Sequence, residues 1–327
     1  MASVVDGSVT KITAEDLAGA TKILEYKFRG CTNLTSVVIP DSVTSIDSHA
    51  FYECTGLINV TIPNTIVTIP RYIFSGCSSL TNITIPDSVT TIDTNSFNGC
   101  ASLPSISIPD SVTTIGSSAF MNCENLASVT IGNGVTKIDN YAFGGCHGLT
   151  SMVIPGNVTN IGSYVFQRCS NLESATLCEG VTGIGGYMFA ECGKLTNVTI
   201  PNTVTSIGTY AFFVCTSLTS VTIPDSVKSI GSYAFKSCIG LTSAIIGNGV
   251  TKIDVQAFSG DTKLEYIDLT SYGAGKTFPT LANTNVFTNC GTSTTSGTFE
   301  IRVLAGRKDE LAGMSNWSTY ADNIVEV

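Results

Sequence analysis

The chain has 327 residues, of which 43% are hydrophobic and 13% charged, and its net charge is −9 at pH 7. No apolar run reaches the roughly 18 residues that a membrane-spanning helix needs, so we expect no insertion into a membrane. The acidic excess leaves no basic stripe to neutralise a phosphate backbone, which excludes nucleic acid as an expected partner.

The N-terminal segment, residues 1–18, reads as a cap that contains a shortened repeat, Val9-Thr10-Lys11-Ile12 and Leu17. Charged residues interrupt the start of the chain too often for the apolar stretch of a secretory signal, so we expect no signal peptide there. These residues are Asp6, Lys11, Glu15, Asp16, Lys22 and Glu25.

A 23-residue period follows, and no insertion breaks it. It is marked by eleven phenylalanines, Phe28, Phe51, Phe74, Phe97, Phe120, Phe143, Phe166, Phe189, Phe212, Phe235 and Phe258. A cysteine stands three positions after each of the first ten, and Asp261 takes that place in the eleventh. A fixed period of this kind indicates stacked repeats that share one core, so we expect one elongated domain.

Each repeat begins with two short extended pieces. In one unit, Leu80, Ile83 and Ile85 alternate as in a strand, and a proline that cannot donate to a strand ladder ends this piece. Val89 and Ile92 mark the second piece, which is followed by a Gly or Asp suited to a turn.

The rest of each repeat reads as a single helical turn. Ala119, Phe120 and Cys123 stand at positions i, i+1 and i+4, which predicts one inward face. Because no unit can bury its own apolar face, the coils must stack. We therefore predict for residues 19–269 a leucine-rich-repeat solenoid of the α/β class with mostly short parallel strands. Its eleven 23-residue coils are expected to form a curved, right-handed stack with a cap at each end.

Residues 270–327 are the predicted C-terminal cap, because the register fails there. The next Phe-x-x-Cys begins at Phe287, which is 29 residues after Phe258. A Ser/Thr/Gly stretch, residues 291–298, precedes an alternating strand, a short helical segment and Trp317.

The repeat unit resembles the BspA-like, or Treponema pallidum type, leucine-rich repeat. The mark of that family is Ile-Pro-x-x-Val-Thr-x-Ile-Gly-x-x-Ala-Phe-x-x-Cys, a pattern that residues 223–238 follow. The tail from Asn316-Trp317-Ser318 to Ile324-Val325 also resembles the terminal cap of the family. The resemblance implies an extracellular or cell-surface protein, adhesin-like in some members; a cytoplasmic location stays open, and a fold does not fix a function.

The cysteine column is expected to consist of reduced, buried thiols. Stacking brings successive cysteines within nominal disulfide reach, but their Cβ vectors run parallel and the positions are needed for packing. Disulfides and a metal role are the alternatives, and structural zinc prefers more clustered cysteines. Cys178 stands outside the column and is the expected accessible thiol.

No residue group predicts catalysis, so we expect neither an enzyme nor a cofactor or metal site. Residues 270–277 nearly match a phosphate-binding loop but lack its first glycine, so a loop into the cap is the better reading. His49 and His147 occupy different repeat positions and lack the spacing of a metal pair.

Two outward columns are the candidate binding surfaces. The strand face carries Thr84, Thr130, Thr176, Thr199 and Thr222, with Asn82 and Asn197 beside them. The position before Ala-Phe carries Tyr141, Tyr164, Tyr187, Tyr210 and Tyr233. Tyrosine is enriched at protein interfaces. The structural alternatives are hydrogen-bonded threonine ladders on the first column and edge packing on the second.

The sequence thus favours a monomeric, non-catalytic binding module that recognises a protein or glycan. The alternatives are a structural spacer in a surface layer or phage particle, and an intracellular interaction scaffold.

Overall fold

The structure is a computed structural model that describes residues 9–293 and 299–327. It consists of two compact units, Met1–Cys169 and Ser170–Val327, and each is described by itself. The first eight residues of the predicted N-terminal cap and residues 294–298 of the Ser/Thr/Gly stretch lie outside the described residues.

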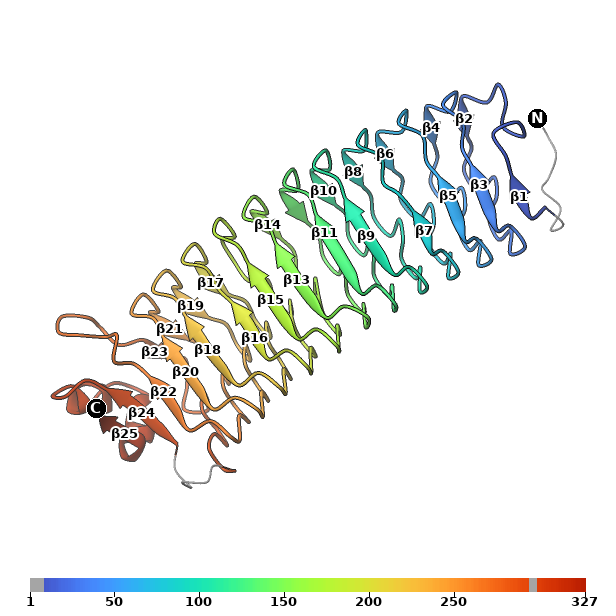
Figure 1. Ribbon diagram of the computed structural model, residues 1–327. Helices are drawn as coiled ribbons and strands as arrows, with labels where there is room; N and C mark the ends of the chain where they lie inside the picture. The colour runs from blue at the N-terminus through green and yellow to red at the C-terminus, as the bar shows by residue number, and fades with distance from the viewer. Residues whose placement is uncertain (1–8, 294–298) are drawn as a thin grey trace. The chain divides into compact units, whose positions relative to one another are not determined.

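Both units are built from two series of short parallel strands, one on each side of the coils (Figure 1). In the first unit, the first series is β1 (Lys11–Ile12), β3 (Ser36–Val38), β5 (Asn59–Thr61), β7 (Asn82–Ile83), β9 (Ser105–Ile108), β11 (Ser128–Ile131) and β13 (Ser151–Ile154). The second series is β2 (Lys22–Ile23), β4 (Ser45–Ile46), β6 (Thr68–Ile69), β8 (Thr91–Ile92), β10 (Thr114–Ile115), β12 (Lys137–Ile138) and β14 (Asn160–Ile161).

The second unit repeats this arrangement. Its first series is β15 (Ser174–Leu177), β16 (Asn197–Thr199), β18 (Ser220–Ile223), β20 (Ser243–Ile246), β22 (Tyr266–Asp268), β24 (Glu300–Val303) and β25 (Ile324–Glu326). Its second series is β17 (Ser206–Ile207), β19 (Ser229–Ile230), β21 (Lys252–Ile253) and β23 (Thr280–Leu281), with a bridge between Ile184 and Ile207.

The predicted repeat solenoid is confirmed, with more coils than expected. Residues 23 apart pair across neighbouring strands, as Asn59 does with Asn82. Within the described residues the first series has fourteen strands. Eleven of these belong to the 23-residue units, and β1, β24 and β25 add one strand each from the terminal segments.

Stacked phenylalanines form the centre of both units. Successive rings in the first unit have centroids 5.1 to 5.7 Å apart. In the second unit the spacing is 5.0 to 5.7 Å, and the stack continues through Phe287 despite the longer gap before it. The eleven repeat phenylalanines are at most 3% exposed. Their burial and offset stacking account for the invariance of this column.

The predicted helical turn is wrong. The segment around Ala-Phe consists of successive turns in which alternate N–H groups donate in different directions. Tyr141 and Phe143 donate to the next coil, at Ser163 O (3.0 Å) and Val165 O (2.9 Å), whereas Gly144 donates locally to Tyr141 O (3.0 Å). A helix would satisfy these donors internally and leave the next coil without partners.

Left-handed residues produce this alternation. The residue before Ala-Phe has φ between +51° and +64° in all eleven repeats, and the residue immediately before each column cysteine is also left-handed. Within the described residues, helices occur only in the C-terminal segment, as α1 (Lys308–Ala312) and the 3-10 helix η1 (Trp317–Asn323).

The cysteine column consists of free thiols, as predicted. None of the twelve cysteines forms a disulfide, and ten of them are buried. The buried thiols also bond across coils: Cys123 Sγ donates to Phe97 O (3.2 Å) and Cys215 Sγ to Phe189 O (3.2 Å). Cysteine therefore supplies a small apolar side chain and a weak donor at one position.

Asp261 interrupts that column. It is fully buried, its Oδ1 accepts from Cys238 N (2.8 Å), and its Oδ2 has no hydrogen-bond partner. Burial raises the pKa of its carboxyl well above the usual value, so the group is held as a neutral acid.

The C-terminal segment closes the second unit with its own strands and helices. Trp317 is fully buried, and its Nε1 donates to Pro279 O (2.7 Å). The Tyr320 hydroxyl accepts from Phe287 N (3.2 Å) and contacts the end of the phenylalanine stack edge-on. The alternating strand and short helix expected before Trp317 are present as β24 and α1.

We expect the thiols to react in two classes. Burial raises the pKa of the Cys123 thiol to about 12, and that of Cys77 is also raised, so few thiolates form in the folded chain. In native buffer a thiol reagent should modify half-buried Cys178 quickly and the ten buried cysteines slowly. In denaturant all twelve should react, and a lower count would contradict the reduced column.

Replacing Asp261 by Asn should stabilise the fold at neutral pH. Because the folded pKa is raised, the folded state holds a proton that the unfolded chain releases above about pH 4. The stability from this proton is complete below pH 4 and declines as the pH rises. Asp261→Asn keeps the acceptor for Cys238 N–H without titrating. Its Tm gain, roughly 2–4 °C per kcal/mol, should be larger at pH 8 than at pH 3.5; an equal gain at both would contradict the assignment.

Candidate functional site

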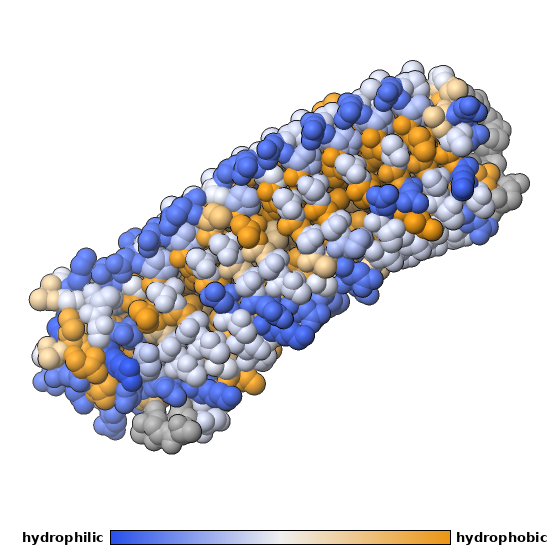
Figure 2. All heavy atoms as spheres, in the orientation of Figure 1, coloured by the Kyte–Doolittle hydropathy of each residue, from blue (hydrophilic) through white to orange (hydrophobic). Residues whose placement is uncertain are grey.

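The strand face carries the predicted threonine column with its side chains outward. Thr84, Thr130, Thr199 and Thr222 are exposed and Thr176 is half-buried, while Asn82 and Asn197 beside them are also exposed. Figure 2 shows that apolar and weakly polar atoms dominate along the first strand series, with more hydrophilic side chains at its margins. The column therefore presents small hydroxyl groups on a mostly apolar background.

The hydroxyls of this column have no partners within the described residues. None of Thr61, Thr84, Thr130, Thr176, Thr199 and Thr222 forms a side-chain hydrogen bond there. The threonines of the second strand series differ, because they donate to the preceding coil: Thr113 to Thr90 O (3.2 Å) and Thr205 to Thr182 O (3.1 Å). Hydrogen bonding to the preceding coil therefore accounts for the threonines beside the second strand series, but it does not account for the threonines of the candidate column.

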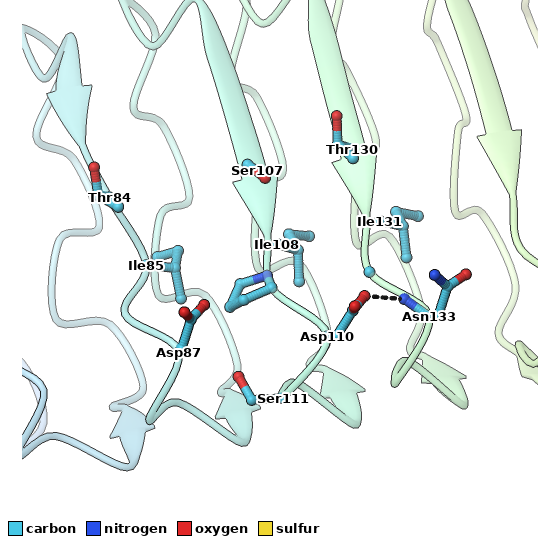
Figure 3. Close-up of a pocket in the computed structure, with 12 residues that line it drawn as sticks. Thr84, Ile85, Asp87, Ser107, Ile108, Asp110, Ser111, Thr130, Ile131 and Asn133 are labelled. Carbon is cyan, nitrogen blue, oxygen red and sulfur yellow. Dashed lines mark hydrogen bonds between the residues drawn. The ribbon is translucent and has the colours of Figure 1, made fainter.

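A shallow groove runs below the column in the first unit (Figure 3). It encloses about 640 Å³. Thr84, Ser107 and Thr130 form one row along it, and the buried Ile85, Ile108 and Ile131 form the next row. On the far side lie Asp87, Asp110 and Asn133. The groove combines hydroxyls, an apolar floor and an acidic rim.

The same repeat positions form a groove of about 460 Å³ in the second unit. Thr199 and Thr222 take the places of the first unit's hydroxyl row, Ile200 and Ile223 those of the apolar row, and Asp225 that of the rim. Two rim carboxylates bond to the following coil: Asp110 accepts from Asn133 N (2.6 Å) and Asp225 from Asn248 N (2.8 Å). The sequence reasoning found the threonines but missed these rim carboxylates, because aspartate after proline reads as turn chemistry.

The tyrosine column is half-buried and tightly stacked within each unit. In the first unit, the ring centroids of Tyr141 and Tyr164 are 4.4 Å apart. In the second unit, Tyr210 lies 4.5 Å from both Tyr187 and Tyr233, and Phe213 contacts it edge-on. The rings cover one another's faces and leave mainly their edges to solvent.

These tyrosines occupy a backbone conformation that a bulky residue adopts at a cost. Their φ values lie between +56° and +64°, in the left-handed region. That region costs most residues roughly 1–2 kcal/mol, and asparagine tolerates it better. Asn95 and Ser118 occupy the same repeat position in other coils. The ring is therefore not required by the backbone, so stacking or binding must account for it.

Within the described part of the chain, no group of His, Cys, Asp and Glu is arranged to hold a metal ion. Residues 270–277 lead to β23 rather than to a helix, and their carbonyls at Tyr272, Gly273 and Lys276 accept from the Arg307 guanidinium. A phosphate loop would aim N–H groups at its ligand, so the segment is a cap loop, as expected.

No helix among the described residues is long and apolar enough to cross a membrane.

The 23-residue repeat is that of a known protein family. The profile of the BspA type leucine rich repeat region (6 copies) matches residues 6–103, 90–215 and 182–303. The chain belongs to this family. BspA-type repeats are typically non-catalytic binding scaffolds. A search of curated proteins finds no match.

Two solved leucine-rich proteins are similar to this one. A leucine rich cell surface protein from Faecalibacterium prausnitzii is 31% identical, with a TM-score of 0.54 over 95% of this chain and 90% of that one. A leucine-rich repeat protein from Eubacterium ventriosum is 26% identical, with a TM-score of 0.52 over 82% of this chain and 86% of that one. Both support the coil architecture.

The left-handed backbone at Tyr210 predicts that two substitutions there will differ in thermal stability. Tyr210→Asn loses ring stacking, worth about 0.5–1.5 kcal/mol per pair, but gains a residue suited to its φ. Tyr210→Val loses the stacking and suits that φ poorly. Thermal unfolding should place Tyr210→Asn near the parent and Tyr210→Val several degrees lower. Equal melting temperatures for the two variants would contradict a role for the backbone here.

Proposed function

We propose that this BspA-type protein is a non-catalytic binding module of a bacterial cell surface, and that its strand face recognises a protein or glycan ligand. The observation that carries the proposal is the column of threonine hydroxyls without partners above an apolar groove, found at the same repeat positions in both units. Hydroxyls in such a position can donate to and accept from a ligand without breaking a bond of the fold.

The cell-surface assignment rests on relatives. The similar protein from Faecalibacterium prausnitzii is described as a leucine rich cell surface protein. Within each unit, a groove built from equivalent positions of successive coils suits an extended ligand, because each coil adds one equivalent set of contacts. The tyrosine column is a second candidate surface on the same module, supported by the left-handed backbone that these rings occupy.

Two other roles compete with this proposal. A structural spacer needs only stacked coils and no partnerless hydroxyl row, while an intracellular scaffold fits the reduced cysteines. A spacer should bind no extracellular ligand, which makes direct binding the deciding measurement.

The experiment compares the parent chain with two variants on immobilised matrix proteins and on a glycan array. The strand-face variant carries Thr84→Val, Thr130→Val, Thr199→Val and Thr222→Val. Valine occupies this column naturally at Val38 and Val153, so the fold should be preserved. We expect the parent to bind at least one target and this variant to lose roughly tenfold or more in affinity, equivalent to about 1.4 kcal/mol.

The flank variant, Tyr164→Asn with Tyr187→Asn and Tyr210→Asn, serves as the matched control. Loss in this variant alone would move the site to the tyrosine column. No binding of the parent to either array would overturn the proposal in favour of a spacer or scaffold.

A further inference from the structure

A second aromatic group lies in the first three coils, away from the strand face. Tyr26, His49 and Tyr72 occupy the position before Ala-Phe and stack with centroids 4.8 Å apart at each step. Tyr52 contacts His49 and Tyr72 edge-on, at 5.6 and 6.3 Å. We call these four residues the N-terminal aromatic cluster. All of them belong to the first unit.

Two arginines extend over this cluster. The Arg29 guanidinium lies 5.5 Å from the Tyr26 ring centroid and 5.4 Å from that of Tyr52. The Arg71 guanidinium lies 5.3 Å from the centroid of Tyr72. Both arginines are exposed, and neither guanidinium has a hydrogen bond or ion pair within the described residues. Stacking orders the two groups while their N–H donors stay available.

The acidic side chains nearby face groups other than the two arginines. Asp47 pairs with Lys22 at 2.8 Å, and Glu25 Oε1 lies 3.4 Å from His49 Nδ1. Glu53 interacts with the Tyr52 hydroxyl and raises the pKa of that hydroxyl. The cluster therefore presents two available guanidinium groups in a protein whose net charge is −9.

Aromatic edges and exposed apolar residues define the rest of the surface. Stacked rings turn their edges outward, and the edge of an aromatic ring is electropositive, which favours an anion. Leu24 is 59% and Tyr26 46% exposed, an unusual exposure for large apolar side chains. Arginine and tyrosine are residue types enriched at the hot spots of protein interfaces.

We propose that the N-terminal aromatic cluster with Arg29 and Arg71 is a binding site for an acidic polypeptide segment. Two carboxylates of the segment would each accept from one guanidinium fork, and an apolar side chain of the segment would cover Leu24 and Tyr26. A sulfated glycan fits less well, because it has no apolar side chain to cover the exposed Leu24 and Tyr26.

The spacing suits such a segment. Arg29 and Arg71 belong to coils two steps apart, and each step moves the stacked ring by 4.8 Å. Tyr26 and Tyr72, on which the two arginines stack, are thus about 10 Å apart along the stack, a distance that roughly three residues of extended chain span.

The test measures fluorescence polarisation of a fluorescein-labelled synthetic peptide made of Glu-Glu-Leu repeats, added to the full chain. We expect saturable binding that weakens with added salt, and none with the matched Gln-Gln-Leu peptide. The double variant Arg29→Gln/Arg71→Gln should bind the acidic peptide roughly tenfold or more weakly. Arg29→Lys/Arg71→Lys should also lose most of the affinity, because lysine keeps the charge but not the planar fork.

Arg302→Gln is the matched control. Arg302 also stacks on a tyrosine, 3.6 Å from the Tyr266 centroid, but its Nε donates to Glu300 at 3.0 Å. This variant should bind the peptide like the parent. Melting temperatures of all variants separate loss of binding from loss of folding.

Three outcomes would overturn the proposal: no binding of the acidic peptide, equal binding by parent and Arg29→Gln/Arg71→Gln, or stronger competition by heparin than by unlabelled acidic peptide. The strand-face variant retains this cluster, so it should bind the peptide normally. Failure of one site is therefore distinguishable from failure of the other.

Discussion

Every coil of this protein depends on hydrogen bonds that leave it. A 23-residue turn has too little interior to satisfy its own backbone, so strand N–H groups and alternate turn N–H groups donate to the neighbouring coil. The left-handed residues of each turn aim those donors outward along the stack. The phenylalanine, leucine and cysteine columns pack inside this frame, and Cys Sγ adds one more bond between coils. Neighbouring coils thus stabilise each other, and a coil without a neighbour needs a cap.

The period in the sequence was sufficient to predict the repeat, its strands and the reduced cysteines. Apolar residues at fixed spacing determine which side chains face inward, and that inference needs no backbone detail. The turn was mispredicted because Ala-Phe-x-x-Cys has helical spacing, while its hydrogen bonds depend on φ at the residue before alanine. A tyrosine such as Tyr141 or Tyr210 does not indicate a left-handed backbone in the sequence, whereas a glycine such as Gly99 or an asparagine such as Asn95 does.

The candidate site was predicted in part for a related reason. Alternation along a strand identifies Thr84 and Thr130 as outward, so their column was found from the sequence. Whether a threonine hydroxyl is bonded depends on which carbonyl of the preceding coil lies within reach, as it does for Thr113 and not for Thr130. The N-terminal aromatic cluster was missed because His49 stands where its neighbours have tyrosine. Only the stacked geometry places it with Tyr26 and Tyr72.

The cysteine column also determines how the folded protein is lost over time by oxidation. While the chain is folded, ten thiols are buried and shielded from oxidants in solution. When the whole chain unfolds, all of these thiols become exposed, and any two of them can form a disulfide. Such a chain cannot refold with the disulfide in place, because the Cβ vectors of stacked cysteines run parallel. In an oxidising medium, survival would therefore follow the rate of unfolding rather than the equilibrium stability.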